Sequence, residues 1–302
     1  MPKLFWFLFA IAAAGSGLAG YAWANSKRVI TSDVTIAIPD LPPGLDGLRI
    51  LHVADTHFPA NGESLERFLA TAKGLDYDLV LATGDYAESA DGWPVVVEAF
   101  RRLDPGLGIF ASLGGHERYA GTPSWRGDNV VRDLLNVGQL LRRRRRGLIS
   151  PSPLIAALEA VGVTVLENDN LSLEIGGELV RLVGIDDAWM GLARLDQALP
   201  PAEAAGFRLL LSHTPDGLLH ERAGEVDLAL CGHTHGGQIR FPLVGAPVRH
   251  ARSVERHAAA GLLRISGVPT YVSRGFGTTM LPFRLGALPE LSVLELRREQ
   301  SA

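Results

Sequence analysis

The sequence predicts an α/β fold, because apolar strands alternate with helical segments and each strand ends in polar residues. Three such strands occur early, at 48–54, 78–83 and 108–113, and each is apolar enough to be covered on both faces. Segments with helical spacing, 64–73 and 93–103, follow the first two. This rhythm is typical of α/β sheets, which bind ligands just beyond the carboxyl ends of their strands.

The remaining elements follow in order. A short extended tether and a first strand occupy 29–47, before the three strands above. In the second half of the chain, 154–161 has the pattern of a helix, and Gly176-Gly177 marks the turn of a hairpin. The strands that we predict there are 164–166, 171–175, 179–185, 207–212, 225–231, 270–273 and 291–296.

Composition limits the class of protein. The 302 residues allow one large α/β domain or two small ones, and 47% hydrophobic with 21% charged residues is an ordinary globular balance. The net charge of −4 gives no reason to expect a nucleic-acid binder. Cys231 is the single cysteine, so an intrachain disulfide is excluded, and we interpret it as a small buried hydrophobe.

The N-terminus contains an uncharged run of about twenty residues, 4–23, which is long enough to cross a bilayer. We interpret 1–28 as a retained membrane anchor, because the run exceeds the apolar core of a typical signal peptide. The rival interpretation is a signal peptide cleaved after the small-x-small triplet 22–24, which would release a soluble exported protein. Basic residues flank the run on both sides, so its orientation stays open, with a slight preference for a cytoplasmic domain.

The least regular stretch is a basic insertion at about 119–153, which contains five consecutive arginines, Arg142 to Arg146. Such a run is usually a solvated loop. Beside an anchor, it is also suited to an anionic membrane surface. Nucleic-acid binding is not expected there, because the run lacks interleaved aromatic residues.

Polar residues at the predicted strand ends form the candidate site. They are Asp55, His57, Asp85, His213, His233 and His235. The last two lie in C-G-H-T-H-G-G-Q (231–238), which taken alone is equally well explained as a surface loop. A set of carboxylates and imidazoles without a thiolate suits Mn, Fe or Zn in a catalytic site.

The order D-x-H, G-D, G-x-H-E, H and G-H-x-H resembles the calcineurin-like metallophosphoesterases, over 48–296. The anchor and the segment S-R-G-F-G-T (273–278) are similar to the membrane-associated bacterial branch, some members of which hydrolyse UDP-2,3-diacylglucosamine. The resemblance implies a four-layer αββα sandwich with mixed sheets at 29–302. This domain would follow an N-terminal transmembrane helix in a bacterial inner membrane.

The resemblance also implies roles for these residues. The first metal would be bound by Asp55, His57 and His235, and the second by His213 and His233, with Asp85 bridging both. His116 would face the leaving-group oxygen as general acid or charge stabiliser, and Glu117 would orient it. Arg240 and Arg274 are weaker candidates for binding phosphate, and solvated loop positions explain them better.

The implied function is hydrolysis of a phosphoric ester or pyrophosphate bond by a hydroxide that two divalent ions activate. The anchor favours a lipid or nucleotide-lipid substrate, and the oligomeric state stays open. One departure weakens the expectation. The family pattern is G-N-H-D/E, whose Asn is a ligand of the second metal, and here that position is Gly115. We therefore expect a weaker second site, for which Glu117 and Glu88 are the candidate substitutes for the Asn. The alternative is a metal-binding membrane scaffold whose catalytic site has decayed.

Overall fold

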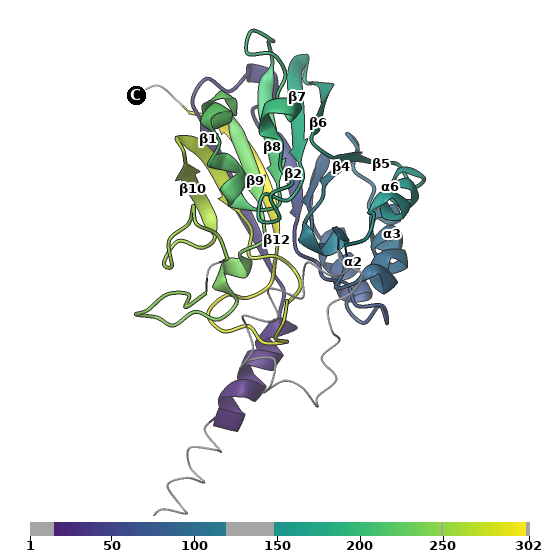
Figure 1. Cartoon of the computed structure of the whole chain (residues 1–302), viewed down its shortest axis with the longest axis vertical. Helices are drawn as coiled ribbons and strands as arrows, with labels where there is room; N and C mark the ends of the chain where they lie inside the picture. Colours follow the sequence, from purple (N-terminus) through teal and green to yellow (C-terminus); the bar gives the residue numbers. More distant parts are fainter. Residues whose placement is uncertain (1–14, 119–147, 249, 300–302) are drawn as a thin grey trace, which may run out of the picture.

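Two six-stranded sheets form the centre of the computed structural model, which describes residues 15–118, 148–248 and 250–299 (Figure 1). The first sheet has the order β1-β12-β2-β3-β4-β5. Its strands are β1 (Ile30–Ile38), β2 (Arg49–Val53), β3 (Leu79–Thr83), β4 (Ile109–Ser112), β5 (Val163–Leu166) and β12 (Glu290–Arg298). All pairs are parallel except β12 with β2, so the sheet is mixed, as predicted.

The second sheet has the order β10-β11-β9-β8-β7-β6. Its strands are β6 (Asp169–Ile175), β7 (Glu178–Ile185), β8 (Phe207–Ser212), β9 (Leu228–Cys231), β10 (Gly261–Ile265) and β11 (Val268–Val272). The two edge pairs are antiparallel and the central pairs are parallel. Both sheets therefore present the carboxyl ends of several parallel strands at one edge.

Three apolar clusters hold these layers together. The sheets pack on each other through side chains such as Ile50 and Leu81 from the first and Leu209 and Leu230 from the second. The outer face of the first sheet is covered by α2 (Leu65–Lys73), α3 (Trp93–Arg101) and α6 (Ser152–Glu159). The outer face of the second carries α7 (Leu195–Ala198), 3-10 turns and loops, so the expected fourth layer has little regular helix.

The hairpin across Gly176 and Gly177 is present, because both residues adopt the positive φ of a tight turn (60° and 79°). Strand β9 begins at Leu228, three residues later than predicted, because the preceding segment Glu221–Glu225 is a 3-10 helix. Strand β10 was not predicted. It pairs with β11 through a second tight turn at Ser266 and Gly267, and Pro269 interrupts the apolar pattern of β11.

Only part of the predicted N-terminal anchor (1–28) lies within the described residues. A helix is described over 15–26, and the start of the predicted anchor (1–14) lies outside the described residues. Within the described ranges, the helices are all too short or too polar to span a bilayer. Most of the basic insertion, including Arg142 to Arg146, also lies outside them.

Candidate active site

The six predicted metal ligands meet where the two sheets bring their strand ends together. Asp55 and His57 follow β2, Asp85 follows β3, His213 follows β8, and the last two histidines follow β9. They form two triads, buried except for the half-buried His233, and within each triad the ligand atoms lie within 4.8 Å of one another. The first triad is Asp55, His57 and His235, and the second is Asp85, His213 and His233.

In the first triad, Nε2 of His57 lies 3.2 Å from Nε2 of His235, which is 3.5 Å from Oδ1 of Asp55. Asp55 is held from the other side by the backbone N–H of His233, 3.0 Å from each carboxylate oxygen. Burial raises the pKa of Asp55 to about 6, with His213 opposing the shift. A cation between these three groups would stabilise the charged carboxylate.

In the second triad, Nε2 of His213 lies 3.3 Å from Oδ2 of Asp85 and 3.1 Å from Nδ1 of His233. The carbonyl oxygen of Thr83 lies 2.7 Å from Nδ1 of His213, so this nitrogen donates and leaves Nε2 free to bind a metal. Asp85 also reaches the first triad, because its Oδ2 is 3.8 Å from Nε2 of His57.

The donor set fits two divalent cations. In each triad, two imidazole nitrogens face one another at hydrogen-bond distance beside a carboxylate, which is how ligands converge on an ion. Metal binding requires neutral imidazole. Burial, with a neighbouring cation adding to it, places the pKa values of His233 and His235 well below the usual range. Against burial, Glu88 raises the pKa of His57 and Asp85 raises that of His213, so an ion would displace a proton from each of these two rings.

The backbone at the site is strained. Five of the six ligands have positive φ although none is glycine: Asp55 (49°), His57 (42°), Asp85 (54°), His233 (68°) and His235 (51°). Asp and His tolerate this region better than most residues, yet it costs free energy that the surrounding structure must offset. Strain of this kind concentrates at functional sites.

Glu117 differs from the expectation that it orients His116. Its carboxylate accepts hydrogen bonds from the backbone N–H groups of Asp85 (2.9 Å), Tyr86 (2.8 Å) and Gly114 (2.8 Å). Burial raises the pKa of Glu117 to about 7, with Asp85 adding to the shift. Its carboxylate therefore joins the loop after β3 to the loop after β4.

His116 lies at the same centre. Its backbone N–H donates to Oδ1 of Asp85 (2.8 Å), and its Nε2 lies 3.9 Å from Oδ2 of that residue. The ring also packs edge-on against His57, with the centroids 4.6 Å apart. His57, Asp85 and His116 form a third group whose atoms can hold an ion, so position alone does not separate the acid from the ligands.

The two arginines that we predicted to bind phosphate are not among the residues that line the pocket. Arg274 pairs with Glu290, which accepts from both its Nε (2.7 Å) and its backbone N–H (2.7 Å). Arg240 donates from Nη2 to the carbonyl oxygen of His257 (3.0 Å).

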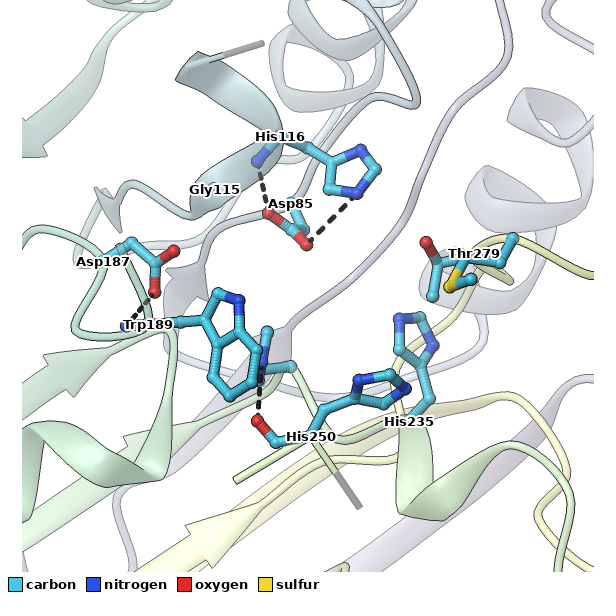
Figure 2. Close-up of a pocket in the computed structure, with 10 residues that line it drawn as sticks. Asp85, Gly115, His116, Asp187, Trp189, His235, His250 and Thr279 are labelled. Carbon is cyan, nitrogen blue, oxygen red and sulfur yellow. Dashed lines mark hydrogen bonds and ion pairs between the residues drawn. The ribbon is translucent and has the colours of Figure 1, made fainter. Parts of the chain in front are cut away.

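The pocket instead contains residues for which no role was predicted (Figure 2). Asp187 and Trp189 lie on one side of Asp85, and Thr279 lies beside His235. His250 and Met280 also line the pocket. Trp189 is 42% exposed, and its ring lies 5.5 Å from that of His233. In the sequence, the polar pair Asp186-Asp187 directly follows the predicted strand 179–185, and a polar strand end of this kind is the one signal that indicates this part of the pocket.

Comparison with known proteins agrees with this geometry. Residues 48–237 match the family model described as calcineurin-like phosphoesterase. The chain is 31% identical to phosphodiesterase YaeI of Escherichia coli, covering 82% of each protein. It is 27% identical to the uncharacterised metallophosphoesterase YkuE of Bacillus subtilis, covering 98% of this chain and 96% of the relative.

A third relative, from Danio rerio, bears the name transmembrane protein with metallophosphoesterase domain. It is 25% identical and covers 91% of this chain, which spans 58% of the relative. The match to the family model extends from the start of β2 to the loop that carries His233 and His235, and so includes both triads. The chain therefore belongs to the calcineurin-like phosphoesterase family of metal-dependent hydrolases that act on phosphoric ester bonds.

Proposed function

We propose that this protein hydrolyses a phosphoric ester or pyrophosphate bond in a membrane-associated substrate, a lipid or nucleotide-lipid. The hydrolytic part rests on one observation: Asp85 Oδ2 stands between a histidine of each triad, 3.8 Å from His57 and 3.3 Å from His213. Two divalent ions held in this way supply the charge that activates water and stabilises the phosphoryl oxygens.

The protein's own groups would position and protonate the substrate. His116 lines the pocket beside Asp85, with its Nε2 3.9 Å from Oδ2 of that carboxylate. A protonated His116 can donate to the leaving-group oxygen. The pocket is open to solvent, so a phosphoester can reach these groups from outside.

The position of the N-terminal helix supports a substrate at the bilayer. β1 is parallel to β12, which is antiparallel to β2, so β1 begins at the end of the sheet where β2 delivers its ligands. The helix over 15–26 precedes β1 and projects from that end (Figure 1). The carbonyl of Ala22 accepts from the backbone N–H of Arg284 (2.9 Å), whose side chain contacts His235.

Exposed apolar side chains occur on the loop that follows the His233–His235 segment. Phe241, Leu243, Val244 and Val248 are 43%, 92%, 55% and 54% exposed. Apolar side chains on a loop near an anchoring helix are suited to contact with lipid. The membrane location and the single-pass anchor of 1–28 remain part of this proposal.

Turnover by the full-length protein in detergent micelles tests the chemistry. We would measure hydrolysis of an aryl phosphodiester and an aryl phosphomonoester without metal and with Mn, Fe or Zn. We expect metal-dependent turnover that Asp85→Ala abolishes and Asp76→Ala retains, because the Asp76 carboxylate is 94% exposed. If bound metal gives no turnover on these or lipid phosphoesters, the chain is the metal-binding scaffold that Gly115 suggested.

The location needs separate measurements. N-terminal sequencing of the mature protein distinguishes a retained anchor from cleavage after Ala24. Activity on a lipid pyrophosphate in vesicles should exceed activity on its water-soluble headgroup analogue. Equal activity on both would contradict a membrane substrate and leave the hydrolase intact.

A further inference from the structure

The second triad has no ligand from position 115, because Gly115 has no side chain. Asp85, His213 and His233 leave room in the coordination shell of a second ion. A buried acceptor oxygen close to Gly115 would fill that room. Three acidic side chains lie close enough to the site to be considered: Glu117, Glu88 and Asp187.

The first two are engaged elsewhere. Both carboxylate oxygens of Glu117 accept backbone hydrogen bonds. Glu88 reaches the other triad, where its Oε2 lies 3.3 Å from Nδ1 of His57.

Only one of the two carboxylate oxygens of Asp187 accepts hydrogen bonds. It is 1% exposed, and its Oδ1 accepts from the hydroxyl of Thr214 (2.7 Å) and the backbone N–H of Trp189 (3.0 Å). Its Oδ2 is also buried, but finds no hydrogen-bond partner among the described residues. A buried carboxylate oxygen without a partner is costly, so a site that retains one calls for an explanation.

The position of Asp187 indicates what that partner is. β7 runs parallel to β8 with Ile185 opposite Ser212, so Asp187 emerges beside the segment His213-Thr214. It lines the same pocket as Asp85, Gly115 and His233. Figure 2 shows its second oxygen on the side of Gly115 and Asp85, while the first is held by Trp189.

We propose that Asp187 completes the second metal site, where its Oδ2 replaces the amide oxygen missing at Gly115 through one water, because Asp187 lies outside the atoms that converge within 4.8 Å of one another. The inference rests on the proposed metal-dependent function and deepens it. Thr214 and Trp189 fix Oδ1, so Oδ2 is presented without loss of side-chain freedom when the ion binds. The second site then carries two carboxylates and two imidazoles, which favours Mn over softer ions.

Metal binding, measured independently of turnover, tests the proposal. Mn(II) is titrated into the metal-free full-length protein in micelles, and free Mn(II) is followed by electron paramagnetic resonance. Wild type should bind two ions. Asp187→Ala should retain the first ion and bind the second at least tenfold more weakly. Asp76→Asn, which removes the same charge from a carboxylate that is 94% exposed, should bind as wild type does.

A rescue variant separates ligation from packing. Gly115→Asn in the Asp187→Ala background should restore most of the lost affinity, because it returns the family's amide to the same ion. Thr214→Val, which removes one of the donors to Oδ1, should weaken the second ion to a smaller extent. If Asp187→Ala does not fold, Thr214→Val replaces it as the test variant.

Two outcomes overturn the proposal. One is a second-ion affinity in Asp187→Ala, or in Thr214→Val where it stands in, within twofold of wild type. The other is wild-type protein that binds one ion only. If wild type binds two ions through Asp187 but hydrolyses no phosphoester, the proposed function fails and the metal site stands.

Discussion

Arg284 donates from Nη2 to the ring Nδ1 of His235 (3.0 Å) and from Nη1 to the carbonyl oxygen of the same residue (2.8 Å). One guanidinium therefore fixes both the ring and the backbone of a predicted ligand. Arg284 is completely buried, and it also donates to the carbonyls of Gly275 and Gly277. Burial lowers its pKa to about 10, so it stays charged at neutral pH.

Arg284→Met should destabilise the fold and weaken the first metal site. Methionine retains much of the apolar stem but removes the guanidinium hydrogen bonds to His235, Gly275 and Gly277. The carbonyls of His235 and Gly275 keep the backbone N–H groups of Gln238 and Glu290 as donors. The carbonyl of Gly277 and Nδ1 of His235 lose a charged donor, at about 1.5–3 kcal/mol for each such bond, so the free energy of unfolding should fall by about 3 kcal/mol or more. Denaturant unfolding of the metal-free protein measures this loss, and Mn(II) titration measures affinity at the first site.

Arg252→Met is the matched control, because the Arg252 side chain is 83% exposed. It should change the free energy of unfolding by less than about 0.5 kcal/mol. Equal behaviour of the two variants would mean that Arg284 does not support His235.

Gly114→Ala should abolish binding of the second ion. A Cβ at Gly114 would lie 2.4 Å from Oδ1 of Asp85 and 2.9 Å from Cγ of His213, distances that no real Cβ tolerates. Both ligands would have to move, and metal sites lose affinity when their ligands are displaced. Gly106→Ala is the control, because an added Cβ there meets nothing within 4 Å. Unchanged Mn(II) binding in Gly114→Ala would show that the loop after β4 adjusts freely.

The strand ends show how much the sequence reveals by itself. The predicted strand 207–212 coincides with β8, because six consecutive buried residues end abruptly at a polar one. The local pattern also placed His213 and Asp85 at strand ends. Parallel strands bring their carboxyl ends to one edge, so adjacency in space followed from the predicted class of fold.

Contacts between distant segments were not predictable in this way. Arg284 lies 49 residues after His235, in a stretch with no regular periodicity, and nothing in its neighbours indicates burial. The sequence also does not predict that Oδ2 of Asp187 has no partner. That depends on where the hydroxyl of Thr214 and the backbone N–H of Trp189 lie, because both donate to Oδ1. Strand β10 was not predicted because it is a short edge strand, G-L-L-R-I, in which only the last residue is buried.

His52 should make the metal-free protein sensitive to mild acid. Burial lowers its pKa from 6.5 to about 4, against an opposing effect of Glu290. The unfolded chain therefore takes up this proton near pH 6.5, whereas the folded protein resists it until about pH 4. Stability present above pH 6.5 is lost as the pH falls, by about 2 kcal/mol between pH 7 and pH 5.

Comparison of wild type with His52→Gln isolates this contribution. Glutamine does not titrate, and its amide can keep the contact that His52 Nε2 makes with the hydroxyl of Thr83 (3.0 Å). Denaturant unfolding in the presence of a chelator, at pH 7 and pH 5, should show a smaller loss for the variant. The same loss in both proteins would mean that folding does not lower the pKa of His52.

Trp189 should bind the part of the substrate that is not phosphate. It is exposed, lines the pocket, and packs against His233 through one face. Loss of an aromatic contact of this kind costs about 1.4 kcal/mol, which is about tenfold in affinity. Trp189→Ala should therefore raise KM for an aryl phosphodiester about tenfold and change kcat little, because only the backbone N–H of Trp189 supports Asp187.

Leu179→Ala, an exposed apolar position at the opposite end of β7, should leave both constants unchanged. A fall in kcat with constant KM would instead place Trp189 in the support of the metal site.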